Sequence, residues 1–297
     1  MPKSQFITPA EARTNGGITL APISVNAGNT TSNKALPARN FTKRAPVRTK
    51  RATLDTKASL RDRVLAGLMR RSPYVAIDTI RRELSAQRVR IADSTLLNYL
   101  QEFVADGFIH SAGRGWYSIL ARRLTFDRAP VEPVVSLIKE SFPALDFSVW
   151  STQQINPWMH HLLGKFVTFV HVEKEGIGPI WELLRDAGYD TYRNPARREI
   201  AATFAVRGQT AVIRPGAPGQ SPTDNHYALP EKIFVDLAGE IKKIPLMDMS
   251  EFEMMFSNAI QSARLEIPVL LRYSARKMLR AKLLHIINST LAEIEKI

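Results

Sequence analysis

The sequence predicts an α+β protein built from three successive parts. They are a disordered basic arm over residues 1–57, a small helical unit closed by a β-hairpin over 58–123, and a mixed α/β unit that ends in an all-helical segment over 130–297. Three observations support this prediction: positive charge is confined to the first 123 residues, helical patterns precede a glycine-rich hairpin, and helix and strand patterns alternate after residue 130. A chain of 297 residues is long enough for two folded domains.

The composition excludes several classes of protein. The absence of cysteine removes disulfide scaffolds, cysteine-ligated zinc, iron–sulfur clusters and thiol nucleophiles. No run of 18 apolar residues occurs, so we expect no membrane span, and the first residues lack the basic-then-apolar order of a secretory signal. We therefore expect a cytoplasmic protein of bacterial type.

The net charge of +13 is distributed unevenly along the chain. Residues 1–57 hold ten Lys or Arg against two acids, residues 58–123 hold eleven Arg against six acids, and the rest is balanced at twenty of each. This segregation indicates that the first 123 residues meet a polyanion. In the arm we expect phosphate contacts from Lys43, Arg44, Arg48, Lys50 and Arg51. The alternative is a solvated leader without a partner.

Three helices and a hairpin are predicted in the second part. Residues 59–62 have the S-x-x-D spacing of a capping box, and apolar residues continue a first helix over 59–71. A second helix opens near Asp78, and a third runs over 93–106, ended by Gly107. Two β-type runs, 108–111 and 116–120, flank a glycine-rich turn with Arg114 at its tip. This order resembles a winged helix-turn-helix, which implies binding of double-stranded DNA.

The third helix has one apolar and one polar face. At 100° per residue, one sector gathers Leu96, Leu97, Leu100, Phe103 and Val104. The opposite sector carries short hydrogen-bonding side chains suited to base edges in the major groove, and arginines before the helix and on the hairpin suit phosphates. The candidate DNA-binding residues are Arg88, Arg90, Ser94, Thr95, Asn98, Gln101 and Arg114. Because the helix lacks Lys and Arg and holds three acids, a protein-interaction module with a solvated polar face is the alternative.

The last part alternates between helices and short strands. Helices are expected over 131–140, 153–163 and 177–187, and strands over 147–150, 166–172, 191–193 and 210–213. From residue 231 onward every pattern is helical: 231–241, 250–263 and 269–291, with a break near Ala275.

Four short motifs carry a second resemblance. They are V-W-S-T at 149–152, F-V-T-F-V-H-V-E at 166–173, the dipeptide Asn194-Pro195 and the helix start L-P-E-K-I-F-V-D-L at 229–237. Together with the predicted DNA-binding unit, they resemble the AbiEi-type antitoxins of type IV toxin–antitoxin (abortive-infection) systems. The resemblance implies a repressor that binds inverted repeats in its own promoter, and a partner gene for a nucleotidyltransferase-like toxin, countered without a stable complex.

Two groups of charged residues are candidates for the antitoxin role. Glu231, Lys232 and Asp236 begin a helix, where capping and the helix dipole would equally explain the acids. Near the C-terminus, residues 272–282 include five basic residues and no acid, and Arg276, Lys277 and Arg280 are the centre of this run. The run is either a second surface for nucleic acid or a partner, or an ordinary basic face.

The motifs of an enzyme are missing. His160 and His161 are adjacent, so in a helix they would point to different faces and lack the spacing of a helical zinc site. A metal-dependent nuclease is the main enzymatic alternative, with Asp146, Glu173 and Asp190 at strand ends and Lys174 beside Glu173. We expect no catalytic residue, cofactor or metal. We expect instead a DNA-binding repressor that acts as an antitoxin and binds DNA as two copies, with a stand-alone regulator as the other alternative.

Overall fold

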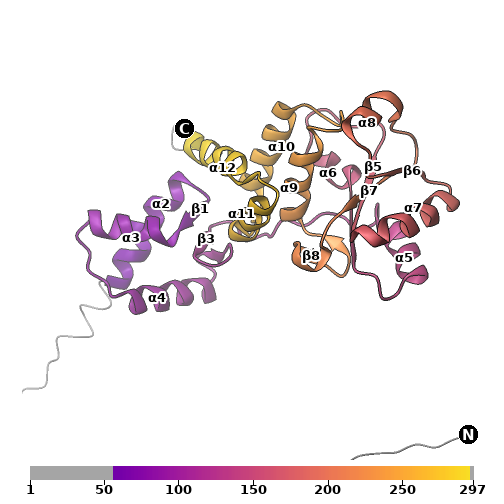
Figure 1. Ribbon diagram of the computed structural model, residues 1–297. Helices are drawn as coiled ribbons and strands as arrows, with labels where there is room; N and C mark the ends of the chain where they lie inside the picture. The colour runs from indigo at the N-terminus through magenta and orange to yellow at the C-terminus, as the bar shows by residue number, and fades with distance from the viewer. Residues whose placement is uncertain (1–55, 295–297) are drawn as a thin grey trace, which may run out of the picture. The chain divides into compact units, whose positions relative to one another are not determined.

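The computed structural model describes residues 56–294, which form a mixed α/β protein with a C-terminal helical segment (Figure 1). The predicted arm, with the basic run at 43–51, lies outside the described residues apart from 56 and 57. Among the described residues, no helix combines the length and the apolar character that a membrane span requires.

The first helix continues through a π-helical stretch, η1 (Leu60–Leu65), into α2 (Ala66–Arg71). The predicted capping box at 59–62 is wrong. Ser59 has helical angles, φ −62° and ψ −40°, and its side chain makes no cap hydrogen bond. The helix already includes residues 56–58, so Ser59 lies inside it and does not face free N–H groups. The predicted end is confirmed, because Ser72 is extended.

Three helical segments pack with a small antiparallel sheet of order β1-β3-β2. The predicted helices are α3 (Ile77–Ala86) and α4 (Asp93–Ala105), and the predicted hairpin is β2 (His110–Ser111) with β3 (Trp116–Ser118). Gly107, Gly113 and Gly115 have φ of 71°, 99° and 73°, as their turns require. Strand β1 (Tyr74–Ala76) was not predicted, because it is defined by pairing with β3 some forty residues later.

This helical unit has its own hydrophobic core, formed by Leu60, Val64, Leu65, Ile80, Leu84, Leu96, Leu100 and Phe103 with their neighbours. The predicted burial of Leu97 is wrong, since its side chain is 41% exposed. Helix α4 buries the narrower stripe of Leu96, Leu100 and Phe103, at i, i+4 and i+7, and Leu97 lies at its edge.

A six-stranded mixed sheet forms the centre of the last part, in the order β6-β7-β5-β4-β9-β8. Strands β5, β7 and β6 are parallel, β4 is antiparallel to β5, and β9 is parallel to β4. The strand bounds are β4 (Phe147–Ser151), β5 (Val167–Val172), β6 (Asp190–Arg193), β7 (Thr210–Pro215), β8 (Thr223–Asp224) and β9 (Tyr227–Ala228). The pair β8 and β9 was not predicted, because two-residue strands carry no readable alternation.

Helices cover both faces of this sheet (Figure 1). Helices α5 (Glu132–Ser141) and α7 (Ile177–Asp186) pack on one face, against Val170 and Val172 of β5. Helices α9 (Pro230–Glu240) and α10 (Met249–Ser262) pack on the other, against Val167 and Phe169. Successive strand residues point to opposite faces, so His171 faces α9.

Two helical predictions need correction. The helix expected over 153–163 is only α6 (Thr152–Ile155) followed by the 3-10 turn η2 (Asn156–Trp158), because Pro157 removes a backbone donor and Met159 is extended. The helix α8 (Arg197–Thr203) was not predicted, and neither were the short turns η3 (Lys174–Gly176) and η4 (Pro218–Gln220).

The C-terminal segment ends with α11 (Ile267–Arg276) and α12 (Arg280–Ile294). The predicted break is present, although it falls at Met278, whose φ is 56°, rather than at Ala275. The segment before α11 holds the small sheet: the hydroxyl of Tyr74 donates to the carbonyl of Ala263 at 3.0 Å and accepts from Leu265 N–H at 2.9 Å.

Candidate functional site

The carboxyl ends of three parallel strands bring polar residues together. His171 is the fifth residue of β5, Arg214 the fifth residue of β7, and Asn194 directly follows β6. His171 and Arg214 are opposite each other in the strand register. Ligands of open α/β sheets bind at this edge, where the strands end and loops diverge. The sequence predicted the strands, but not that these three residues would meet.

Helix α9 contributes a buried ionic cluster to this edge. Lys232 Nζ lies 2.6 Å from Asp236 Oδ2 and 3.0 Å from the hydroxyl of Tyr273 on α11, and that hydroxyl donates to Asp236 Oδ1 at 2.8 Å. His171 Nε2 lies 3.5 Å from Asp236 Oδ2, and Lys277 Nζ lies 3.8 Å from Oδ1. The side chains of Lys232 and Asp236 are only 1% and 3% exposed.

Helix capping therefore does not explain Lys232 and Asp236. These two residues are four positions apart on α9 and form a buried ion pair. Glu231, in the first turn of α9, is also buried; one of its oxygens accepts from Glu266 N–H at 2.9 Å. Burial raises the pKa of Glu231. The helix-dipole interpretation remains compatible with Glu231 alone, since only that acid lies at the helix start.

Burial and mutual charge set the ionisation of the cluster. Burial opposes ionisation of Asp236, but Lys232 and the other nearby cations outweigh it and lower its pKa to about 2. Burial lowers the pKa of Lys232, against the attraction of Asp236. Burial, reinforced by Lys232, lowers the pKa of His171 well below its ordinary value. Burial and Asp236 together raise the pKa of Tyr273. The cluster at neutral pH is thus an ion pair beside a neutral imidazole and a neutral phenol.

This ionisation predicts that stability falls in mild acid. A histidine whose pKa is lower in the folded chain binds fewer protons there, so protonation below its unfolded value of about 6.5 favours the unfolded state. The contribution of His171 is complete above that pH and is expected to fall by up to about 1.4 kcal/mol per pH unit below it. Urea unfolding between pH 7 and 5 measures this slope. His171→Leu should flatten it, whereas the exposed control His285→Gln should not; equal slopes in all three proteins would contradict the prediction.

A second buried pair lies beside the first. Arg214 donates from Nε and Nη2 to Glu240 Oε2, at 3.2 and 2.6 Å, and from Nη1 to Asn194 Oδ1 and the Pro195 carbonyl, at 3.2 and 2.9 Å. Asn194 has φ 44°, a conformation that asparagine tolerates better than most residues. Arg214 therefore fixes the loop after β6 to the end of α9. Sequence reasoning missed Arg214 and Glu240, because nothing in the sequence pairs them.

Three cavities line the same edge of the sheet. The first, of about 440 Å³, is bounded by His171, Asn194, Arg214, Asp236, Glu240, Lys242, Lys243 and Lys277 among others. The second, of about 430 Å³, is bounded by Lys174, Ile177, Gly178, Arg193, Asn194 and Pro215. The third, of about 230 Å³, includes His171, Lys232, Tyr273, Arg276 and Lys277. Of the predicted C-terminal basic residues, Arg276 and Lys277 thus border cavities, whereas Arg280 is exposed and borders none of these three.

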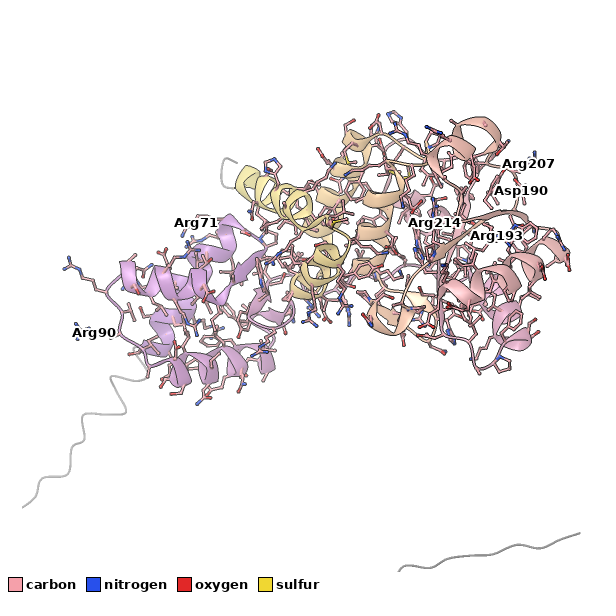
Figure 2. All side chains as sticks on the ribbon, in the orientation of Figure 1. Arg71, Arg90, Asp190, Arg193, Arg207 and Arg214 are labelled. Carbon is pink, nitrogen blue, oxygen red and sulfur yellow. The ribbon has the colours of Figure 1, made fainter. Side chains whose placement is uncertain are left out.

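The predicted DNA-binding residues of α4 are mostly on the surface. Ser94, Asn98 and Gln101 are exposed, and Thr95 is half-buried. Arg88 and Arg90 are exposed on the turn before α4, where Arg90 extends at the edge of this unit (Figure 2), and both border a hollow of about 770 Å³ at the start of the helix. Arg114 is exposed, and its hairpin is anchored: Ile267 N–H donates to the Ala112 carbonyl at 3.1 Å.

Two of the acids that count against DNA binding by α4 have partners. Arg81 contacts Asp93 through Nε and Nη2, at 3.2 and 3.1 Å, and Lys57 pairs with Glu102. These pairs reduce the negative charge that the helix presents at its start and in its last turn.

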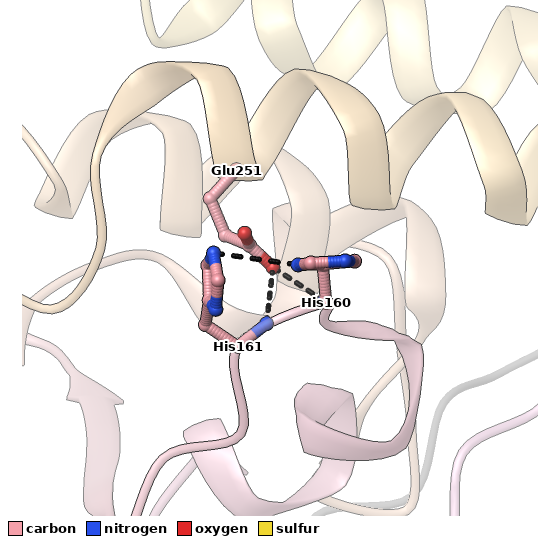
Figure 3. Close-up of side chains that lie close together, drawn as sticks. All are labelled: His160, His161 and Glu251. Atoms are coloured by element: carbon pink, nitrogen blue, oxygen red, sulfur yellow. Dashed lines mark hydrogen bonds between the residues drawn. The ribbon is translucent and has the colours of Figure 1, made fainter.

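Within residues 56–294, one group of side chains could hold a metal ion. His160 Nδ1 and His161 Nε2 are 3.3 Å apart, and the potential ligand atoms of these residues and Glu251 lie within 4.8 Å of one another (Figure 3). The expectation that the two histidines diverge on a helix is wrong, because Pro157 ends the helix before them. Zinc suits such donors. Glu251 Oε1 already accepts the backbone N–H groups of both histidines, at 2.6 and 3.2 Å, which fixes this loop to α10.

The carboxylates of the nuclease alternative do not gather. Asp146 and Glu173 flank the paired residues Phe147 and Val172, at the edge where β5 ends. Asp190 begins β6, which runs parallel to β5 through β7, and therefore lies at the opposite edge, near Arg207 (Figure 2).

Fold and site together define a mixed α/β protein with buried ion pairs and basic cavities at the carboxyl ends of its parallel strands. Residues 95–293 match the family described as "Family of unknown function (DUF6577)", and the chain belongs to this family. The matched range begins in α4 and covers the hairpin, the mixed sheet and most of the helical end. A comparison with curated proteins found no match to this sequence.

Proposed function

We propose that the chain is a DNA-binding transcriptional regulator whose residues 58–123 form a winged helix-turn-helix, with α4 as the recognition helix. The observation that carries this proposal is the exposed polar face of α4, Ser94, Asn98 and Gln101, directly after a turn with two exposed arginines. Asn and Gln pair with adenine through two hydrogen bonds, and arginines hold the adjacent phosphates.

Charge and anchoring support the same proposal. The excess positive charge of the chain lies wholly in residues 1–123, which suits a polyanionic partner. The hairpin that carries Arg114 is fixed at both ends, since Gly115 also accepts from Ile77 N–H at 2.9 Å. A fixed hairpin presents its arginine to the duplex at little entropic cost.

The resemblance to AbiEi-type antitoxins extends the proposal. The DNA partner is then the chain's own promoter, bound by two copies at an inverted repeat, and a nucleotidyltransferase-like toxin is its functional partner in a bacterial cytoplasm. Growth of cells that produce the neighbouring gene's product, with and without this chain, separates an antitoxin from a stand-alone regulator.

Asn98→Ala is expected to reduce discrimination between sequences by about 1–3 kcal/mol at the base it reads. Because Asn98 is exposed and alanine favours helices, the fold should be retained. A mobility shift measures this, with a duplex from upstream of the chain's own gene against a scrambled duplex of equal composition. The matched control is Asn258→Ala, an exposed asparagine on α10, which should bind like the unaltered chain. A sequence preference that survives Asn98→Ala would refute the assignment of α4.

A further inference from the structure

The cavities at the carboxyl ends of β5, β7 and β6 are lined by far more cations than carboxylates. Eight Lys or Arg side chains border them, against Asp236 and Glu240 as the only acids among those lining residues. Such an excess in a recess attracts anions and holds them more strongly than an open surface would.

The two acids do not neutralise this excess. Asp236 forms an ion pair with Lys232 and lies near Lys277. Glu240 forms ion pairs with Arg214 and Lys243. The other four cations, Lys174, Arg193, Lys242 and Arg276, have no carboxylate within ion-pair distance among the described residues. Positive charge that no carboxylate of the described residues neutralises therefore remains in each cavity.

A buried hydrogen-bonding atom points to a ligand with more than negative charge. His171 is 3% exposed, borders two of the cavities, and its Nδ1 has no hydrogen-bond partner among the described residues. Its Nε2 faces the carboxylate of Asp236. A carboxylate only accepts, so the proton of the neutral ring belongs on Nε2, and Nδ1 is an acceptor in need of a donor.

We propose that this edge of the sheet binds a phosphorylated small molecule that also carries a hydroxyl group, such as a sugar phosphate or a nucleotide. The phosphate is held in the first cavity by Lys242 and Lys277, and the hydroxyl donates to His171 Nδ1, which belongs to a residue bordering the same cavity. The volume of the first cavity, about 440 Å³, is within the range of small-molecule sites. A nucleic-acid strand would contact the exposed lysines but not a buried imidazole.

Isothermal titration of the full chain, without DNA, tests this proposal separately from the proposed regulation. The probes are ribose 5-phosphate, ATP and inorganic pyrophosphate, which distinguish a hydroxyl-bearing phosphate from phosphate alone. We expect saturable binding of ribose 5-phosphate, ATP or both, and weaker binding of pyrophosphate.

The double variant Lys242→Gln/Lys277→Gln should weaken binding about tenfold for each lysine. The matched control Lys139→Gln/Lys165→Gln removes the same charge from exposed sites away from the cavities and should bind like the unaltered chain. His171→Leu should weaken the hydroxyl-bearing probe about tenfold and leave pyrophosphate unchanged. If circular dichroism shows that His171→Leu does not fold, the proposal is tested by the lysine double variant and by the relative affinities of the three probes.

Three results would overturn the proposal. They are no heat from any probe at millimolar concentration, an equal loss in the control double variant, or a loss of binding to a ten-nucleotide single strand in Lys242→Gln/Lys277→Gln as large as the loss for the small probes. The last result would identify the edge as a general polyanion surface.

Discussion

Lys232→Met is expected to lower the free energy of unfolding by about 3–5 kcal/mol, because it leaves Asp236 charged and buried without its partner. Tyr273 and His171 would still contact the carboxylate without carrying a positive charge at neutral pH, and Lys277, 3.8 Å from Oδ1 and partly exposed, would offset only part of the loss. Urea unfolding followed by circular dichroism at pH 7 measures the change. The control Lys139→Met, on the exposed side of α5, should change stability by less than about 0.5 kcal/mol.

The companion double variant distinguishes a lost pair from lost packing. Lys232→Met/Asp236→Leu removes both charges, and buried pairs replaced by apolar residues often lose little stability. We therefore expect the double variant to be more stable than Lys232→Met alone, a strongly non-additive result. A single variant that loses less than about 1 kcal/mol would show that the ion pair does not hold α9 in place.

Removing residues 1–55 is expected to weaken binding to every duplex by on the order of 100-fold or more near 0.1 M salt, without changing sequence preference. This segment holds nine Lys or Arg, and the deletion leaves Lys57 and the described helix intact. If about five of the nine contact phosphates, the slope of log affinity against log salt should shrink by about 4–5. A salt series of mobility shifts measures both quantities.

A second variant separates charge from length. Replacing Lys43, Arg44, Arg48, Lys50 and Arg51 with glutamine keeps the segment but removes its densest charge. It should reproduce most of the loss caused by the deletion. An unchanged salt slope in both variants would show that the segment does not contact DNA, and a lost sequence preference would show that it reads bases.

Local features of the chain were predictable because their causes are local. The helical spacing of Ile80 and Leu84, the β-branched run of β5 and the glycines of the hairpin are confirmed. Predictions from the local sequence failed for features that depend on residues far away in the chain. Strand β1 is defined by its pairing with β3, and the short strand β9 by its pairing with β4. The motif at Ser59 does not cap a helix, because the helix begins before Ser59.

The sequence alone determined the segregation of charge, the order of the longer elements and the burial of Leu96, Leu100 and Phe103 in α4, since composition and periodicity act over short stretches of chain. Only the tertiary structure decided the candidate site. His171, Arg214, Lys232 and Tyr273 lie on four elements spread over about a hundred residues. They meet because parallel strands end at one edge of a sheet, and their ionisation follows from burial and from neighbours that periodicity does not show.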